Sequence, residues 1–323
     1  MRKYSILYIM GLLLFMASCQ KGKADQTQAP AARQTVRIGI ITDVHGGLHD
    51  DDAPERLKTF LVRATAEKPD FIIQLGDLTH GKNMNLLLDI WNQYPGAKYH
   101  VIGNHELDYA SKEDIVTRQN MPGKYYSFDV EAFHFVVLDC NYILKDGEYV
   151  DFNHANYYIT KGFRDLISPE QIEWLKKDIA ATDKPVVIFS HQGFDELWDG
   201  NTVPNRIPVR EIVREANQLA GEHNKVIAFF CGHHHVDSYS MIEGVHYFQM
   251  NSASGFWGGA DYKDPLFAFV TLDNTNHTIS VKGEKSQFVP HTPTTEEFHE
   301  YNLVAPEKSD SLCANINDRV VKY

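Results

Sequence analysis

The chain has 323 residues, with 31 Lys and Arg against 43 Asp and Glu, and a formal net charge of −12. This acidic balance argues against polymeric nucleic acid as a partner, because binding a phosphate backbone requires clustered Lys and Arg. It does not exclude a small phosphorylated substrate, since bound metal ions can supply positive charge locally.

The first residues have the pattern of a secretory signal. Met1-Arg2-Lys3 is followed by an apolar stretch over residues 4–17, which is too short to span a bilayer and ends in small residues. We therefore expect a signal peptide over residues 1–18. Its removal takes Arg2 and Lys3 away and changes the formal charge from −12 to −14.

The sequence Met16-Ala17-Ser18-Cys19 resembles a bacterial lipobox, although Leu is usual where Met16 stands. The resemblance implies lipidation at Cys19 and a lipid-anchored location in the bacterial cell envelope, on the periplasmic or the outer-membrane face. The alternative is an ordinary signal peptide with a chance cysteine. Residues 19–34 are polar and are expected to form a flexible tether.

The remaining cysteines are Cys140, Cys231 and Cys313. An odd number at unpatterned spacing predicts no disulfide framework. Cys140 and Cys231 end apolar segments, so they are expected to be buried thiols.

The body of the chain alternates predicted strands and helices and reads as one mixed α/β domain with two packed sheets over residues 35–285. Residues 286–323 are expected to extend the same domain. The predicted strands lie over residues 36–41, 71–75, 99–102, 186–189, 226–230, 239–242, 245–249, 267–272 and 278–281, with a two-stranded hairpin over 125–138. The predicted helices lie over residues 53–67 and 209–223, and a third starts at the N-cap Ser168.

Polar side chains follow five of these strands, in the segments Asp43-Val44-His45, Gly76-Asp77, Gly103-Asn104-His105-Glu106, Ser190-His191 and Gly232-His233-His234-His235. Ligands of α/β sheets bind outside the carboxyl ends of the strands. We therefore expect these side chains to gather at one edge. Glycine at 76, 103 and 232 would allow the backbone to turn sharply and approach closely there.

The gathered side chains mix carboxylate and amide oxygens with imidazole nitrogens, which suits Mn, Fe or Zn better than Ca or Mg. The absence of cysteine disfavours a purely structural zinc site. Two ions and a hydrolytic reaction are the chemistry that such a set predicts. The candidate ligands are Asp43, His45, Asp77, Asn104, His191, His233 and His235.

The order of the five segments resembles the calcineurin-like metallophosphoesterase superfamily. The resemblance implies a four-layer sandwich of two mixed β-sheets flanked by helices. It further implies that Asp43, His45, Asp77 and His235 hold one ion. The other would be held by Asp77, Asn104, His191 and His233, with Asp77 bridging. His105 would not be a ligand but would protonate the leaving group or stabilise its charge, while a metal-bound hydroxide attacks phosphorus.

Two features bear on the branch of the superfamily. Purple acid phosphatases usually carry Asp at the position of His45 and Tyr at the position of His80, so the chain departs from that branch. The segment Gln171-Ile172-Glu173-Trp174-Leu175 resembles the branch of manganese-dependent ADP-ribose and CDP-alcohol diphosphatases and cyclic-nucleotide phosphodiesterases. Trp174 and Leu175 would also serve as plain core residues.

Expectations for three further residues concern the neighbourhood of the site. His80 is a candidate substrate contact, and so is Trp257, which could stack a flat group but could equally pack against the domain. His234 is expected to face away from the site, because neighbouring side chains of an extended segment alternate.

The sequence therefore predicts a metal-dependent phosphoesterase acting on a small phosphorylated substrate, with a diester or pyrophosphate favoured. A phosphomonoesterase of the acid phosphatase or nucleotidase type is the alternative within the enzyme class. A non-catalytic binding lipoprotein on the same scaffold is the alternative of another class, because a fold does not by itself determine function.

Overall fold

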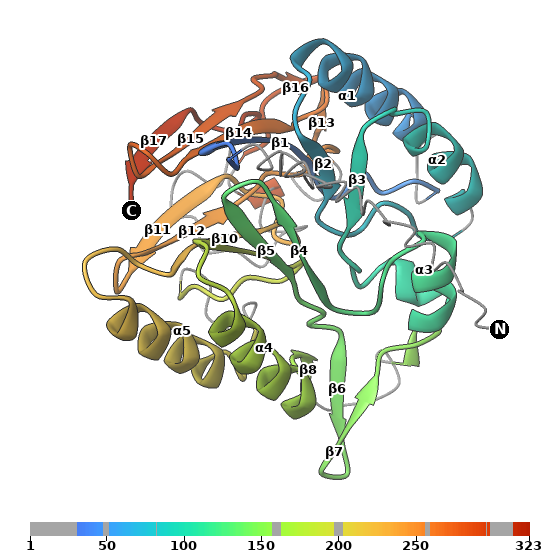
Figure 1. Ribbon diagram of the computed structural model, residues 1–323. Coiled ribbons are helices and arrows are strands. Elements are labelled where there is room, and N and C mark those ends of the chain that lie inside the picture. The colour runs from blue at the N-terminus through green and yellow to red at the C-terminus, as the bar shows by residue number, and fades with distance from the viewer. Residues whose placement is uncertain are drawn as a thin grey trace, which may run out of the picture. The chain divides into compact units, whose positions relative to one another are not determined.

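The computed structural model describes residues 31–47, 52–81, 83–156, 163–196, 203–255, 259–294, 296–297 and 313–323 (Figure 1). The predicted signal peptide, Cys19 and Trp257 lie outside these residues. All of the elements below belong to one compact unit, Ala32–Tyr323. Within the described part of the chain, no helix is both long and apolar enough to cross a membrane.

The first sheet has the strand order β17-β15-β14-β1-β2-β3. Its strands are β1 (Thr35–Ile41), β2 (Phe71–Gln74), β3 (Ala97–His100), β14 (Ala268–Asp273), β15 (Thr278–Gly283) and β17 (Arg319–Lys322). β1, β2 and β3 are parallel, whereas the other pairings are antiparallel.

The prediction of a strand over residues 99–102 is displaced, because β3 ends at His100. Val101 and Ile102 are fully buried. The apolar pattern there reflects burial under the loop that follows the strand.

The second sheet has the order β11-β12-β10-β9-β5-β4. Its strands are β4 (Tyr126–Val130), β5 (Phe133–Val137), β9 (Val186–Phe189), β10 (Val226–Cys231), β11 (Ser238–Ile242) and β12 (Val245–Gln249). β5, β9, β10 and β12 are parallel neighbours. β4 and β11 are each added as the antiparallel arm of a hairpin. The predicted hairpin over residues 125–138 is therefore present, and the strands predicted over residues 239–242 and 245–249 pair with each other.

Helices cover the outer faces of the two sheets, α1 and α2 on the first and α4 and α5 on the second (Figure 1). They are α1 (Ala53–Glu67), α2 (Met84–Trp91), α4 (Pro169–Ala181) and α5 (Ile207–Ala220). The predicted N-cap of α4 is confirmed, since Oγ of Ser168 accepts a hydrogen bond from the Gln171 N–H. α5 starts two residues before the predicted helix and stops before Gly221, which has φ of 84°.

The inner faces of the two sheets pack on each other through aromatic rings. Phe71 of β2 lies 5.0 Å from Phe135 of β5 between ring centroids, and Tyr99 of β3 stacks on Phe128 of β4 at 3.6 Å. Phe71 and Phe135 are fully buried. Aromatic pairs of this kind contribute beyond the area that they bury. The expected four-layer α/β sandwich of two mixed sheets is confirmed.

Several short elements have no counterpart in the sequence-based prediction. They are the 3₁₀ turn η1 (Glu106–Asp108), α3 (Lys112–Arg118), β6 (Tyr142–Lys145), β7 (Glu148–Asp151), β8 (Phe163–Leu166), β13 (Asp261–Tyr262) and β16 (Phe288–Val289). β7, β6 and β8 form a small sheet of their own, and β13 pairs with β16. Apart from α3, which has seven residues, these elements are two to four residues long and are too short to leave a readable hydrophobic period.

Both ends of the described unit are held by specific contacts. Arg33, within the expected tether, forms ion pairs with Asp70 and Glu131, at 3.0 Å to the latter. The backbone N–H of Asn274 donates to the carbonyl of Gln34. At the other end, β17 lies within the expected C-terminal extension and forms the edge of the first sheet.

His134 of β5 gives the fold a pH-dependent contribution. Its ring nitrogens lie 2.7 Å from Asp129 and 2.9 Å from Asp178 of α4. Burial lowers the pKa of His134, but the two carboxylates outweigh it and the pKa is raised. Because the folded pKa exceeds the unfolded one, this stabilisation is complete below pH of about 6.5 and is lost as pH rises through the folded pKa.

We therefore predict that His134→Gln costs more unfolding free energy at pH of about 5.5 than at pH of about 9. Urea titrations of both proteins at the two pH values measure this difference. An equal cost at both values would show that His134 is not protonated in the folded state at the lower pH.

Candidate metal centre

The seven candidate ligands lie where five parallel strands end, and both sheets contribute. Four of them follow strands of the first sheet, and three follow strands of the second. After β1, β2 and β3 come Asp43, His45, Asp77 and Asn104, whereas after β9 and β10 come His191, His233 and His235. The packing of the sheets brings these loops to one place, as the sequence predicted.

Asp43, His45 and His235 form a first group of ligand atoms. Nε2 of His45 and Nε2 of His235 lie 2.9 Å apart. Oδ1 of Asp43 lies 3.2 Å from Nε2 of His235 and 3.6 Å from Nε2 of His45. All three side chains are buried.

Asp77, His191 and His233 form a second group, with Asn104 beside it. Nε2 of His191 lies 3.0 Å from Oδ2 of Asp77, 3.1 Å from Oδ1 of Asn104 and 3.3 Å from Nδ1 of His233. Asp77 lies near enough to the first group for its charge to oppose the burial that lowers the pKa of His45. Apart from a shared Asp77, the two groups contain the residues that the resemblance assigns to two ions, and the division between two ions stays a prediction.

The geometry fits metal ions. Ligand atoms bound to one ion at about 2.1 Å lie about 3.0 to 3.4 Å apart, depending on the coordination angle. The distances within both groups are close to this range. Oδ1 of Asp43 is buried with Nε2 of His235 and Nε2 of His45 as neighbours, and within the described part of the chain it makes no hydrogen bond of good geometry. A buried carboxylate oxygen in that state requires a cation or another partner.

The backbone at the site is held in a conformation that side chains disfavour. Positive φ angles between 52° and 72° occur at five candidate ligands: Asp43, His45, Asp77, His233 and His235. Left-handed backbone is uncommon outside glycine and clusters at functional sites, where the surrounding structure must maintain it.

The loops after β2 and β3 are locked together at Gly103 and Glu106. A Cβ atom at Gly103 would lie 2.1 Å from the backbone nitrogen of Asp77, so only glycine fits. The Glu106 carboxylate accepts backbone N–H groups from Asp77 at 3.1 Å, Leu78 at 2.7 Å and Gly103 at 3.0 Å. Glu106 is fully buried, and it is the residue that positions Asp77.

Glu106 lies within one of the five predicted ligand segments, but the sequence pattern predicts no role for it. The available signal was an acidic residue directly after the candidate ligand Asn104 and His105.

Burial and the charges of neighbouring ligands shift the pKa values of the candidate ligands in opposite directions. Burial lowers the pKa of His45 to about 4 and holds that of His233 well below its usual range. Burial also disfavours the charged form of His191, but the facing Asp77 outweighs it and raises the pKa of His191 to about 10. The surrounding histidines outweigh burial at Asp43 and Asp77, so the pKa of each carboxyl is lowered. Both carboxylates are therefore ionised, as ligands must be.

His105 lies beside the two groups with a carboxylate behind it. Nδ1 of His105 lies 2.7 Å from Oδ2 of Asp108, and its backbone N–H donates to Oδ1 of Asp77. The His105 side chain keeps 16 % exposure, so it can reach a substrate. Sequence reasoning did not select Asp108, although its i,i+3 spacing from His105 was a usable signal.

The two remaining histidines, His80 and His234, lie in different surroundings. His80 is only 4 % exposed, and its ring lies against that of His105 with centroids 4.1 Å apart and the ring planes tilted by 34°. His234 is buried, with its ring centroid 4.9 Å from that of His233. His234 does not belong to either ligand group.

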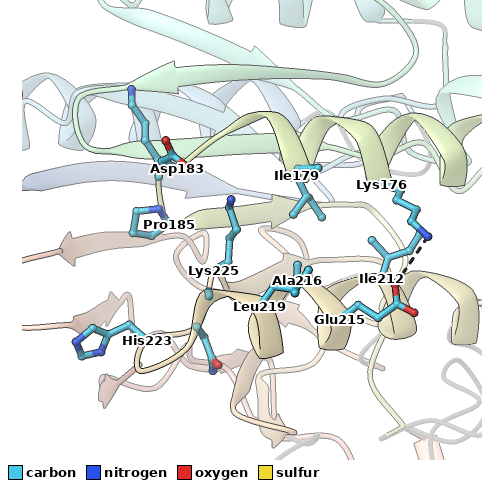
Figure 2. A pocket seen from close by; sticks show the side chains of 14 residues that line it. Lys176, Ile179, Asp183, Pro185, Ile212, Glu215, Ala216, Leu219, His223 and Lys225 are labelled. Carbon is cyan, nitrogen blue, oxygen red and sulfur yellow. Dashed lines mark ion pairs between the residues drawn. The ribbon is translucent and has the colours of Figure 1, made fainter.

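The groove between α4 and α5, of about 540 Å³, is not part of this site. Figure 2 shows its apolar side chains, such as Ile179 and Ala216, and the ion pair of Lys176 with Glu215 at 3.8 Å. The groove lies where both helices end, before β9 and β10 begin. It is therefore at the opposite end of these strands from the candidate ligands.

The calcineurin-like phosphoesterase profile matches residues 36–237. The chain belongs to this family and is a metal-dependent hydrolase whose family uses two metal ions. No curated protein sequence matches the chain.

Two solved structures have a similar fold. A dimetal phosphatase from Danio rerio is 19% identical, with 77% of this chain and 95% of that chain covered and a TM-score of 0.60. GAP50, the anchor in the inner membrane complex of Plasmodium, is 12% identical, with 80% and 87% covered and a TM-score of 0.52. At these identities the likeness concerns the fold alone.

We predict that Glu106→Leu lowers the free energy of unfolding by about 3 kcal/mol or more, because three buried N–H groups lose their acceptor. Glu106→Gln retains one carbonyl oxygen and should cost less. The exposed Glu222→Leu is the control and should stay within about 0.5 kcal/mol of wild type. Urea unfolding of the three variants decides the question, and equal stability of Glu106→Leu and wild type would contradict the assigned role.

Proposed function

We propose that this protein hydrolyses a phosphoester with two metal ions, and that a phosphodiester or pyrophosphate is its substrate. The observation that carries the proposal is the pair of buried ligand groups with His105 beside them. Each group offers a carboxylate and two imidazoles at separations suited to one ion. His105, the proposed acid, lies beside these two groups with its ring oriented by Asp108.

In this proposal Asp43, His45, Asp77 and His235 hold one ion. Asp77, Asn104, His191 and His233 hold the other, with Asp77 shared. When bound, the two ions supply an activated water and neutralise charge on the phosphate oxygens. Mixed imidazole and carboxylate ligation favours Mn, Fe or Zn as their identity.

His105 is the proposed catalytic acid. The contact of its Nδ1 with Asp108 orients the ring and fixes the proton on that nitrogen in the neutral form, so that Nε2 is presented to the substrate. The nearby carboxylates outweigh burial and raise the pKa of His105, which favours the protonated form that can donate to a leaving oxygen. Its other task is to stabilise negative charge as the bond to phosphorus breaks.

The preference for a diester or pyrophosphate rests on the resemblance of residues 171–175 to the diphosphatase and phosphodiesterase branch. In this chain the same residues have structural contacts. Gln171 exchanges hydrogen bonds with the backbone of Asp139, and Trp174 packs on Tyr125. A phosphomonoesterase remains the alternative substrate class, because the described residues around His105 include no Arg or Lys contact that selects a monoester or a diester.

A non-catalytic role is the alternative of another class. It would be signalled by loss of a ligand or of His105, and the chain retains all of these residues. GAP50 of Plasmodium, which has a similar fold, is described as the anchor in the inner membrane complex. For this chain the retained site favours catalysis.

We also propose that the protein is lipid-anchored in a bacterial envelope through Cys19. Arg33 lies just before β1, whereas Asp43 follows it, and β1 has seven residues, or about 23 Å. The chain therefore enters the domain at the edge opposite the site.

Loading the protein separately with Mn, Zn and Fe should produce hydrolysis of bis-nitrophenyl phosphate in preference to nitrophenyl phosphate. Asp77→Asn should lose at least one ion and lower turnover by about 100-fold or more, because it weakens a shared ligand. Elemental analysis and absorbance assays measure both effects. Unchanged metal content and turnover in Asp77→Asn would refute the site, and preference for the monoester would refute the substrate class.

His105→Asn should retain both ions while kcat falls by about 10² to 10⁴, as expected for loss of a general acid. The loss should be smaller for substrates whose leaving group is already a weak base, because these need less protonation. A series of aryl and alkyl phosphodiesters tests this dependence. If the loss were the same for every leaving group, His105 would not be the acid.

A further inference from the structure

We infer that His80 is a positioning residue that fixes the ring of His45 as a metal ligand, rather than a substrate contact. This inference rests on the proposed function, because it assigns a role toward the ion held by the first group. It follows from which nitrogen of His45 faces which neighbour.

The two nitrogens of His45 face different partners. Nε2 points at the first ligand group, 2.9 Å from Nε2 of His235. Nδ1 lies 2.9 Å from Nε2 of His80. A neutral imidazole carries one proton, so a nitrogen that binds a metal leaves the proton on the other nitrogen. Nδ1 of His45 is therefore the donor, and Nε2 of His80 is the acceptor.

The proton of His80 is then on its Nδ1. That nitrogen faces Oδ2 of Asp108 at 3.9 Å, too far for a hydrogen bond but close enough for electrostatic attraction. The same carboxylate oxygen receives Nδ1 of His105 at 2.7 Å. A single carboxylate therefore favours both the orientation of His105 and the tautomer of His80 that supports His45.

The backbone holds this arrangement in place. The N–H of His80 donates to the carbonyl of Gly46 at 2.8 Å, and the N–H of Gly46 donates to the carbonyl of Leu78 at 3.0 Å. Gly46 and Thr79 form a parallel β-bridge. The segments that carry His45 and His80 are thus paired directly after β1 and β2, which fixes the distance between the backbone positions from which the two rings extend.

Burial argues against the alternative role. His80 is 4 % exposed, one of its ring nitrogens is engaged by His45, and one of its faces lies near His105. A substrate would have to displace one of these contacts to reach it. Partners that orient a ligating histidine usually contribute about 10- to 100-fold to metal affinity.

The test compares metal binding by the full-length wild type, His80→Ala and His80→Gln. Free Zn is set with a competing chelator, and bound Zn is counted by elemental analysis. His80→Ala should weaken one of the two ions by about 10- to 100-fold and leave the other unchanged. Gln offers a side-chain carbonyl near the position of Nε2, so His80→Gln should recover most of the affinity.

His246→Ala is the matched control. His246 is also buried and has both ring nitrogens engaged, 2.9 Å from the Tyr239 hydroxyl and 3.0 Å from the Lys322 carbonyl, but it lies in β12 away from the ligands. It should retain wild-type affinity for both ions. Thermal unfolding of the metal-free proteins separates a loss of affinity from a loss of folding.

Three results would overturn the inference. One is wild-type affinity in His80→Ala, and another is an equal loss in Ala and Gln variants, which would indicate packing rather than hydrogen bonding. The third is a wild type that binds three ions, of which His80→Ala loses one and retains two. His80 would then be a ligand of that ion together with His105 and Asp108. Failure of the wild type to bind any of Zn, Mn and Fe would overturn the proposed function as well, so the two failures are distinguishable.

Discussion

The packing of the two sheets against each other is the constraint on which the site depends. Each sheet alone presents only part of the ligand set, four side chains from the first and three from the second. The aromatic contacts of Phe71 with Phe135 and of Tyr99 with Phe128 hold β2 and β3 against β5 and β4. Nε2 of His191 from the second sheet reaches within 3.0 Å of Asp77 from the first because of this contact.

The site contains backbone conformations and buried charges that are unfavourable in free energy, and contacts elsewhere in the domain must offset them. Five candidate ligands have left-handed backbone, and buried carboxylates and histidines crowd together. Such features persist only where surrounding structure over-determines them. The Glu106 carboxylate, with its three backbone donors, does this for the loops after β2 and β3. Metal binding would add to the stability of the folded state by an amount that rises with the logarithm of the free metal concentration once this exceeds the dissociation constant.

The histidines around the site form a connected set rather than separate ligands. Asp108 faces both His105 and His80, and His80 in turn contacts His45. The group that would act on the leaving oxygen and a ligand of the first ion therefore share one carboxylate. A change at Asp108 would be felt at both places, and this coupling distinguishes the site from a simple collection of ligands.

The fold is shared with proteins at 12% to 19% identity, one a dimetal phosphatase and one described as a membrane-complex anchor. The architecture therefore does not decide between catalysis and binding. What distinguishes this chain as a hydrolase is the family match together with a complete set of ligand side chains.

Much of this was readable from the sequence because it is local. The period of the apolar residues predicted the strands of both sheets except β17, with β3 displaced, and the helices α1, α4 and α5. The position of Asp43, Asp77 and His191 after apolar runs predicted that they would meet. Other features depended on contacts between distant segments. Glu106 accepts from a residue 28 positions away, and His80 contacts His45 over 35 positions. The contact of His105 with Asp108 depends on a single 3₁₀ turn. A hydrophobic period records which residues are buried, but it does not record which nitrogen of a ring faces which oxygen, and only the tertiary structure decided that.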